Sequence, residues 1–405
     1  MANPFFSILL PSRNRLELLK FAVESIVDQD WRDLEIVISD NASEPSYAPY
    51  VREITGLSVN YIRSTETLSV TENWNKALDA AQGQYIIMLG DDDALTPGCL
   101  RRLAKTIQKF NGPAVLYVMA YHYAYPGVHQ WAPQGYLAKV NNSVVFVEAS
   151  GPYELPRDQA RQLGIDGLHF RHNVSFNAQH FIWKREYIRE RSRIVPFFQS
   201  PYPDYFACFV TFLTAPRIVV VPTPEMIIGI SRQSFGFYYS NDKQDEGFQQ
   251  FHAKENFVNG SAMSGRDVRA ALGAPGSQHY RNWLLAALSA KNALGDLDGV
   301  EVDLARYLKL QSYEHHKKKR FPRTWTIDEA KALRTQKKAL KSRLYRAFFR
   351  LVESLDKRTI LPIAYMTPRK MANFGLYHPS VVDFQEIENH FNILDAYNWI
   401  KRRNN

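Results

Sequence analysis

Short apolar runs alternate with stretches of helical periodicity over the first 120 residues, and this pattern limits the fold more than any other feature. A short apolar run predicts a buried strand, and apolar residues three or four positions apart predict a helix. Strands that alternate with helices favour parallel pairing in a doubly wound α/β sheet. The predicted strands are residues 5–10, 34–38, 60–62, 85–89 and 114–119, and the predicted helices are residues 16–27, 71–81 and 100–110.

The loops after these strands are the expected place for a ligand, because α/β sheets bind ligands beyond the carboxyl ends of their strands. These loops are residues 11–15, 39–44, 64–70 and 90–94.

The remainder of the chain is predicted to add two strands and then to become helical. The strands are residues 217–222 and 226–230, and the clearer helices beyond Phe235 are residues 280–294 and 302–310. A capping box that opens at Thr326 predicts one more helix, extending to Leu355.

The composition is that of a folded protein, because hydrophobic residues form 45% of the chain. Cys99 and Cys208 are too few for a disulfide framework, so we expect small core residues and a reducing compartment. No apolar stretch reaches the roughly 18–20 residues that cross a bilayer, and the run after Pro4 is too short for a signal peptide. We therefore expect a cytoplasmic location, either free or on the cytoplasmic face of a membrane.

The net charge of +9 is concentrated in one C-terminal segment. From Lys317 to Arg350 there are 13 Lys and Arg residues against two acids, a net charge of +11, so the rest of the chain carries −2. Such a segment either lies on an anionic membrane, with Leu344, Phe348 and Leu351 inserted, or forms the solvated basic face of a helix. Nucleic acid is not an expected partner, because no stacking motif or matching fold accompanies the charge.

Asp91, Asp92 and Asp93 form the most distinctive motif, directly after the predicted strand 85–89. Adjacent carboxylates repel one another and resist burial unless a cation or hydrogen bonds compensate. Hard oxygen ligands suit Mg²⁺ or Mn²⁺, which would in turn hold a diphosphate. The alternative is a solvated acidic turn that caps the next helix.

Asp40 follows the predicted strand 34–38 in the same way. Its carboxylate could accept a hydrogen bond from a base N–H or a ribose hydroxyl. The alternative is an Asx turn that closes the strand.

Five motifs, taken in order, resemble the family 2 glycosyltransferases, which have the GT-A fold. The resemblance is strong over residues 5–110 and looser over 111–235. The motifs are Phe6-Ser-Ile-Leu-Leu-Pro-Ser-Arg-Asn14, the strand 34–41 with its Asp, Asn73-Trp-Asn-Lys-Ala-Leu78, Gly83-Gln-Tyr-Ile86 and Leu89-Gly-Asp-Asp-Asp-Ala-Leu95.

The resemblance implies a GT-A type, doubly wound, mostly parallel sheet followed by a mainly helical C-terminal region. We divide the chain into a nucleotide-sugar-binding and catalytic domain over residues 1–235, a helical extension over 236–315 and a basic helical region over 316–405.

The resemblance also implies roles on the donor side. Pro11, Ser12 and Arg13 would lie beside the nucleotide base, which Asp40 would hold. Asn75, and with it Asn73, would face the donor pocket.

For the metal site, the resemblance makes Asp91 the first acid of the family's Asp-x-Asp or Asp-Asp motif, near the ribose or the outer ligands of the metal. Asp92 would bind the metal directly and Asp93 would support it. Many members carry Asp where this chain has Gly90, which leaves open how the three acids divide these tasks.

The acceptor hydroxyl must lose its proton as it attacks, so an enzyme of this kind needs a base. The family places this base downstream of the metal motif, and Asp204 in Ser200-Pro-Tyr-Pro-Asp204 fits. The alternative is that Asp204 only caps the helix that follows. Arg232 follows the predicted strand 226–230, where the family often places a cation or hydroxyl near the leaving diphosphate.

His169, His172 and His180 lie close together in the sequence. Their irregular spacing and the absence of a nearby Cys argue against a zinc site. We expect them to line the acceptor site or to pack in the core.

Together these features predict a metal-dependent, inverting transferase of hexosyltransferase type. It would move a sugar from a nucleotide-diphosphate-sugar donor to a hydroxyl of a glycan or lipid-linked acceptor in polysaccharide biosynthesis, with the acceptor pocket around residues 121–200. The alternatives are a non-catalytic sugar-nucleotide-binding assembly subunit and a nucleotidyltransferase. The loop 11–15 contains no glycine, which disfavours a nucleotidyltransferase and also a dinucleotide oxidoreductase.

Overall fold

A computed structural model describes most of residues 3–404. The predicted helix 326–355 and all but the first four residues of the basic segment that starts at Lys317 lie outside the described residues. The described ranges are 3–129, 132–141, 143–147, 149–193, 195–241, 243–252, 266–295, 300–320, 380–386 and 391–404.

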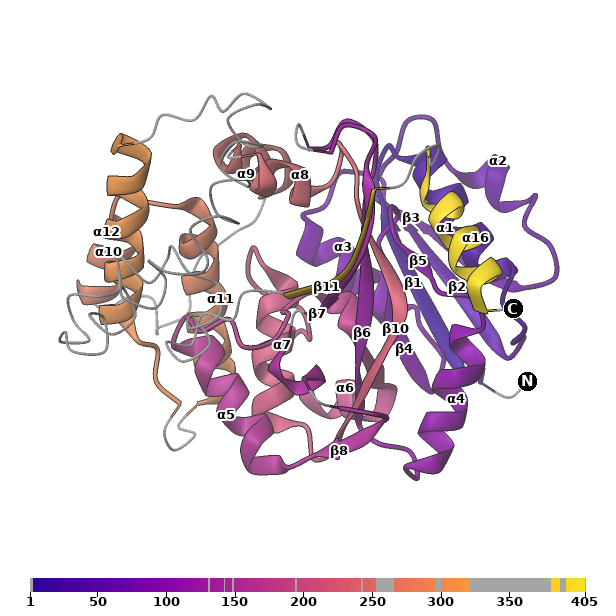
Figure 1. The fold of residues 1–405 in the computed structure, drawn as a ribbon, viewed down its shortest axis with the longest axis horizontal. Coiled ribbons are helices and arrows are strands. Elements are labelled where there is room, and N and C mark those ends of the chain that lie inside the picture. Colours follow the sequence, from indigo (N-terminus) through magenta and orange to yellow (C-terminus); the bar gives the residue numbers. More distant parts are fainter. Residues whose placement is uncertain are drawn as a thin grey trace, which may run out of the picture.

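A central sheet organises the described chain (Figure 1), and eleven strands take part in it. One half is parallel, as the alternation of strands and helices predicts, in the order β4-β1-β2-β3. These strands are β1 (Phe6–Ser12), β2 (Leu34–Asp40), β3 (Ser58–Arg63) and β4 (Tyr85–Met88).

The other half of the sheet is mixed. β9 (Phe181–Lys184) lies between β4 and β6 (Val115–Ala124) and is antiparallel to both. β6 therefore runs in the same direction as β4, and β10 (Ile218–Ile230) pairs parallel with β6. The carboxyl ends of β1, β2, β4, β6 and β10 all lie at one edge, which is where a ligand is expected.

Helices cover both faces of the sheet, because successive residues of a strand point to opposite sides. Ile8 and Leu10 pack with the helices of one face, and Leu9 packs with those of the other. The first face carries α1 (Leu16–Val27) and α4 (Cys99–Lys109), and the second carries α3 (Val70–Asp79), α5 (Arg157–Leu168), α7 (Pro203–Thr214) and α11 (Gln278–Leu294).

Shorter elements connect these layers. They are α2 (Ala48–Val51), β5 (Ala94–Leu95), β7 (Tyr136–Asn141), η1 (Val144–Phe146), β8 (Tyr153–Leu155), η2 (Ala178–His180), α6 (Arg185–Arg191), α8 (Phe235–Ser240), α9 (Gln244–His252), α10 (Arg266–Leu272) and α12 (Leu304–Arg320).

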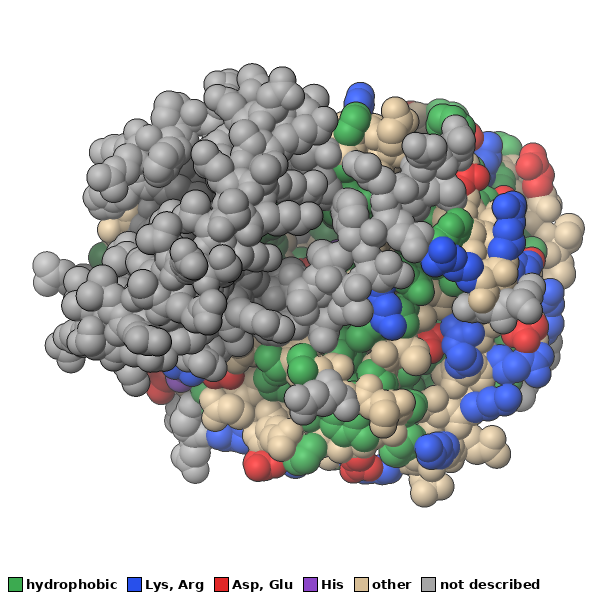
Figure 2. Space-filling model, in the orientation of Figure 1, with side chains coloured by type: hydrophobic (Ala, Val, Ile, Leu, Met, Phe, Trp, Pro, Cys, Tyr) green, Lys and Arg blue, Asp and Glu red, His purple; other side chains and the backbone are tan. Residues whose placement is uncertain are grey.

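Two C-terminal elements return to the sheet-containing part of the molecule. β11 (Ser380–Glu386) pairs antiparallel with β7. α16 (Ile393–Asn404) lies against the side of the sheet that carries α1 (Figure 1), and Tyr397 and Lys401 both donate to the Asp28 carboxylate, at 2.5 and 2.6 Å. Figure 2 shows Lys and Arg side chains gathered over this half of the molecule.

The predicted α/β fold class with a helical C-terminal region is confirmed, with a sheet that is mixed rather than mostly parallel. The two strands predicted at 217–222 and 226–230 are one strand, β10, which bulges around Pro224. Cys99 and Cys208 are buried thiols, as predicted. Among the described helices, none has the length and apolarity to cross a membrane.

Candidate active site

The acidic motif forms a buried turn between β4 and β5, at the carboxyl edge of the parallel strands. Asp91, Asp92 and Asp93 are only 3%, 7% and 2% exposed. The next helix, α4, is capped at Gly98 and not by these acids. The alternative of a solvated turn that caps the following helix is therefore wrong, and the burial of three adjacent carboxylates has to be compensated within the molecule.

Asp93 is compensated by hydrogen bonds from the chain itself. Its Oδ2 accepts from the backbone N–H of Gly90 at 2.8 Å and from Nε2 of Gln179 at 2.7 Å, and its Oδ1 accepts from the N–H of Gly229 at 2.8 Å. A Cβ at position 90 would lie 2.5 Å from Asp93 Oδ2, so a side chain there would require Asp93 to move. Burial, and then the charge of Asp92, raise the pKa of Asp93.

Gly229 on β10 lets that strand pass directly over the acidic turn. A Cβ at this position would lie 1.8 Å from the carbonyl oxygen of Asp92, so no side chain fits without a movement of the backbone. This close approach brings the N–H of Gly229 to Asp93 and places Ser231, two residues later, beside Asp92.

Asp92 is the acid with room for a further ligand. Its Oδ2 accepts from the hydroxyl of Ser231 at 2.9 Å and from the N–H of Ser231 at 3.4 Å. Within the described part of the chain these are its only hydrogen bonds, so Oδ1 is open. Burial raises the pKa of Asp92, the charge of Asp91 raises it further, and Arg15 opposes both.

Asp91 is held by the last residue of β1 and by a residue of the loop that follows this strand. Ser12 Oγ donates to Oδ2 at 2.7 Å, and Arg15 Nη1 donates to Oδ1 at 2.9 Å. Burial alone would lower the pKa of Arg15, but the charges of Asp91 and Asp92 raise it above its ordinary value. Arg13, which is predicted to lie beside the nucleotide base, is exposed in the structure, and the contact of Arg15 with Asp91 was not predicted.

Asp40 is fully buried at the end of β2. Its Oδ1 accepts from the N–H of Ser43 at 2.8 Å, and its Oδ2 accepts from the hydroxyl of Tyr61 at 2.7 Å. The bond from Ser43 is the kind of short-range contact that the Asx-turn alternative requires. A role for Asp40 and for the half-buried Pro11 beside a nucleotide base stays a prediction.

Asn75 on α3 contacts the segment that leads into α7. Its Nδ2 donates to the carbonyl of Phe198 at 2.8 Å, and its Oδ1 accepts from the N–H of Phe198 at 3.1 Å. Thr71 Oγ1 donates to the carbonyl of Ser200 at 2.7 Å. α3 thus positions the Pro201–Pro203 turn, a role that sequence reasoning missed because it joins residues more than 120 positions apart.

Asp204 lies in the first turn of α7, whose N-cap is Tyr202 and not Asp204. It is half-buried, and its Oδ1 accepts from the N–H of Tyr205 at 2.9 Å. Burial raises the pKa of Asp204 to about 7. A carboxyl with such a pKa is suited to general-base chemistry near neutral pH.

A continuous series of contacts joins Asp92 to Asp204. Ser231, which binds Asp92, also accepts a hydrogen bond at its carbonyl from Ser234, the residue that precedes α8. The ring of Phe235, the first residue of α8, lies 5.6 Å from the ring of Tyr202, two residues before Asp204. The acidic turn and the start of α7 are therefore linked through the first residues of α8.

Arg232 and the histidines contribute in different ways. Arg232 is exposed and donates to the carbonyl of Gly127 at 3.3 Å, at the rim of the acidic turn.

His180 is fully buried against the carbonyl of Val118, and burial lowers its pKa to about 3. The ring of His172 packs against Phe176 and Trp283. For His172 and His180 the packing prediction holds.

A metal at this edge would have few protein ligands. In the described residues, no three His, Cys, Asp or Glu side chains are grouped as a metal site. Magnesium-type cations are commonly held by one or two carboxylates together with substrate phosphates, and the open Oδ1 of Asp92 fits that arrangement. Zinc, which prefers three or four nitrogen and sulfur ligands, does not fit.

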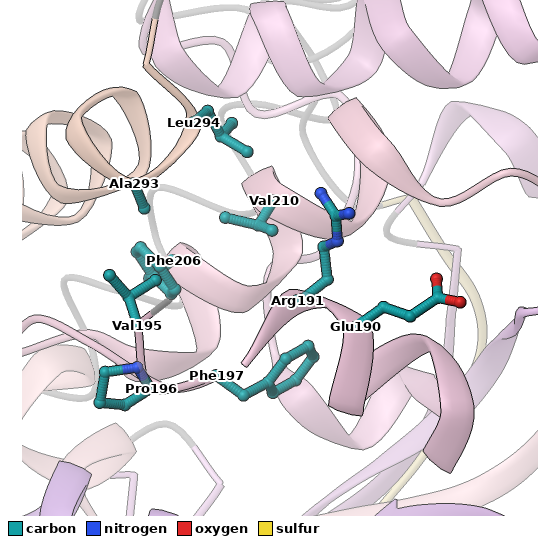
Figure 3. Close-up of a pocket in the computed structure, with 9 residues that line it drawn as sticks. All are labelled: Glu190, Arg191, Val195, Pro196, Phe197, Phe206, Val210, Ala293 and Leu294. Atoms are coloured by element: carbon teal, nitrogen blue, oxygen red, sulfur yellow. The ribbon is translucent and has the colours of Figure 1, made fainter. Parts of the chain in front are cut away.

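A separate pocket lies between α6, α7 and α11 (Figure 3) and contains none of the predicted site residues. It is lined by Glu190, Arg191, Val195, Pro196, Phe197, Phe206, Val210, Ala293 and Leu294.

The fold and this edge define an α/β protein with a buried acidic turn at the carboxyl ends of its parallel strands, the position at which such sheets bind nucleotides. Residues 7–179 match the family described as Glycosyl transferase family 2. Over these residues the chain is similar to that family, as the sequence motifs predict.

Two similar proteins match part of the chain. The GalNAc(5)-diNAcBac-PP-undecaprenol beta-1,3-glucosyltransferase of Campylobacter jejuni is 34% identical over 116 residues, which are 27% of this chain and 35% of that protein. The PGL/p-HBAD biosynthesis glycosyltransferase of Mycobacterium tuberculosis is 32% identical over 102 residues, 24% of this chain and 38% of that protein. The matches thus span little more than a third of these relatives' lengths.

Two solved structures of glycosyltransferases are also similar. S. aureus TarS 1-349 in complex with UDP-GlcNAc has a TM-score of 0.43 and 14% identity, covering 77% of this chain and 92% of that one. The mannosyltransferase PcManGT from Pyrobaculum calidifontis, in complex with GDP-Man and Mn²⁺, has a TM-score of 0.39 and 14% identity, covering 86% of this chain and 84% of that one.

Proposed function

We propose that this protein is a glycosyltransferase that moves a sugar from a nucleotide-diphosphate-sugar to an acceptor hydroxyl in glycan or polysaccharide biosynthesis. The observation that carries the proposal is the buried acidic turn, in which Asp92 keeps one carboxylate oxygen open at the edge where the parallel strands end. The match of residues 7–179 to the Glycosyl transferase family 2 supports the same reaction class. Both relatives described above are named as glycosyltransferases.

We propose that Asp92 holds a divalent cation, Mg²⁺ or Mn²⁺, through Oδ1. When bound, such a cation neutralises a diphosphate and stabilises it as a leaving group. Asp91 orients the site through Ser12 and Arg15, and Asp93 fixes the turn through its three N–H donors rather than as a second ligand. Arg232, at the rim, would add positive charge near the diphosphate.

Asp204 is the proposed base. Its raised pKa allows the carboxylate to take the acceptor proton as the hydroxyl oxygen attacks the anomeric carbon. The bond from that carbon to the diphosphate breaks, and the nucleoside diphosphate leaves. One base and one displacement give inversion at the anomeric carbon. We further propose a glycan or lipid-linked acceptor, with peripheral membrane contact through the basic segment from Lys317 to Arg350, as its charge suggests.

The test is a panel of nucleotide-sugars with and without Mn²⁺, followed by thermal shift and by release of nucleoside diphosphate. Asp92→Asn should lose the Mn²⁺-dependent part of the shift. Asp204→Asn should keep donor binding and lose turnover. Asp158→Asn, which makes the same chemical change in the first turn of α5, is the matched control and should behave as wild type.

The outcomes separate the alternatives. Binding without turnover for any acceptor would indicate a non-catalytic subunit. Release of pyrophosphate from a nucleoside triphosphate and a sugar 1-phosphate, without transfer from any nucleotide-sugar, would indicate a nucleotidyltransferase. Wild-type transfer by Asp204→Asn would show that Asp204 is not the base.

A further inference from the structure

Tyr125 lies at the same edge as the acidic turn but has no role in the site described so far. It directly follows β6, and its N–H donates to the carbonyl of Ile230 at 3.1 Å. Ala124 pairs with Ile230 in the parallel ladder, so Tyr125 stands next to Ser231, the residue that binds Asp92. Residues in register on adjacent strands point to the same side of a sheet. The side chain of Tyr125 is therefore directed to the side on which Ser231 meets Asp92.

The hydroxyl of Tyr125 is a buried polar group without a partner. The residue is 8% exposed, and within the described part of the chain its hydroxyl makes no hydrogen bond. Leaving such a group unpaired costs about 1–3 kcal/mol, so it is rarely retained without a reason. Burial raises the pKa of Tyr125, and the charges of Asp92, Asp93 and Asp91 raise it further. The hydroxyl thus stays protonated and can donate.

The strand order indicates which part of a nucleotide this hydroxyl would meet. Along the edge, Asp40 ends β2, Ser12 ends β1, and the acidic turn follows β4. Tyr125 follows β6, on the far side of the acidic turn from Asp40. If the base lies toward β1 and β2 and the cation at Asp92, Tyr125 lies beyond the cation, on the diphosphate side.

We propose that the Tyr125 hydroxyl donates a hydrogen bond to the diphosphate of the bound donor. This inference rests on the proposed function and names a further binding residue for it. A neutral O–H that donates to an anionic phosphate oxygen forms a charge-assisted bond, which is stronger than one between neutral groups. The surrounding acids do not prevent this, because the tyrosine carries no charge of its own.

The test uses Tyr125→Phe, which removes only the hydroxyl. Binding of UDP, GDP, ADP, CDP and dTDP is measured by calorimetry with Mn²⁺, and the monophosphate of the nucleotide that binds is measured in parallel. Diphosphate affinity should fall about tenfold or more, the effect of losing a hydrogen bond to a charged group. Monophosphate affinity should stay within about twofold of wild type, because the bond is expected at the β-phosphate, which lies further from the base and which a monophosphate lacks. The melting temperature should be unchanged or higher, because no bond within the protein is lost.

Tyr153→Phe is the matched control, because the Tyr153 hydroxyl donates to the carbonyl of Val145 at 2.8 Å, remote from the acidic turn. It should lower the melting temperature and leave nucleotide binding unchanged.

Three results would overturn the inference. They are unchanged diphosphate affinity in Tyr125→Phe, an equal loss of monophosphate affinity, and a lower melting temperature, which would show that the hydroxyl has a partner within the protein. If wild type binds no nucleoside diphosphate at all, the proposed function itself fails, and this inference fails with it.

Discussion

Nη1 of Arg15 lies 2.9 Å from Oδ1 of Asp91, and this ion pair joins the loop after β1 to the turn after β4. Both partners are largely buried, with 16% and 4% of their side chains exposed. Arg15→Met leaves the Asp91 carboxylate buried and unpaired, so we expect the free energy of unfolding to fall by about 3 kcal/mol. Urea unfolding measures this loss.

Adding Asp91→Asn to Arg15→Met should restore part of the stability, because the uncompensated charge is then gone. Lys20→Met is the control, since its pair with Glu17 is exposed and contributes about 1 kcal/mol or less. Equal unfolding free energies for Arg15→Met and Lys20→Met would contradict the assigned pair.

Gly229→Ala should distort the acidic turn, because Gly229 lies on β10, the strand that packs against this turn. The new Cβ would lie 1.8 Å from the Asp92 carbonyl oxygen, so β10 and the acidic turn must separate. We expect a loss of about 1–3 kcal/mol in unfolding free energy, together with weaker Mn²⁺-dependent nucleotide binding. Gly151→Ala adds the same methyl group where no atom lies within 4 Å, and it should be neutral in both assays.

Asn75→Leu distinguishes two roles for this residue. If its amide positions the segment before α7, the variant should unfold about 1–3 kcal/mol more easily and transfer sugar more slowly, with donor affinity unchanged. Asn75→Asp keeps the acceptor for the Phe198 N–H and should be intermediate. A loss of donor affinity with normal stability would instead favour the donor-pocket role that the family resemblance implies.

Transfer should depend on pH through Asp204. Because the base must be ionised and its pKa is raised to about 7, kcat/KM should rise with pH to a plateau above about 7 and fall tenfold per unit below it. Burial favours the protonated form in the folded state, so the contribution of Asp204 to stability is present at low pH and is lost as pH rises through about 7. Asp204→Asn should abolish this part of the stability profile. A kcat/KM that is flat between pH 5 and 8 would contradict the assignment.

The first part of the fold was predictable because local periodicity and packing agree there. The helix predicted at residues 16–27 matches α1 at both ends, because its apolar residues recur at helical spacing and the sheet buries them. β9 was missed because a strand of four residues in an aromatic-rich stretch has no periodicity of its own. α5 was missed because two of its buried positions are the glycines Gly164 and Gly167, which lie against Leu213 and Phe209 of α7 and carry no apolar signal.

The acids of the candidate site were visible in the sequence, but the groups that hold them were not. Three adjacent aspartates after a strand are a local signal. The side chains that donate hydrogen bonds to these aspartates include Arg15, Gln179 and Ser231. They lie 76, 86 and 139 residues away in the sequence from the aspartates that they contact. Contacts at such distances follow from strand order and register, which a single sequence does not reveal. Gly229 likewise becomes meaningful only once β10 is placed over the turn.

The packing of α16 on α1 can form only late in the synthesis of the chain. Lys401 and its partner Asp28 are separated by 373 residues. At roughly 5–20 residues per second, α1 emerges from the ribosome roughly 20–75 s before the helix that covers it. Until α16 is made, β5 lacks its contacts with that helix, and Gly229 lacks Ile393 as a neighbour. Packing around the edge that carries the acidic turn is thus completed only after α16 has been synthesised.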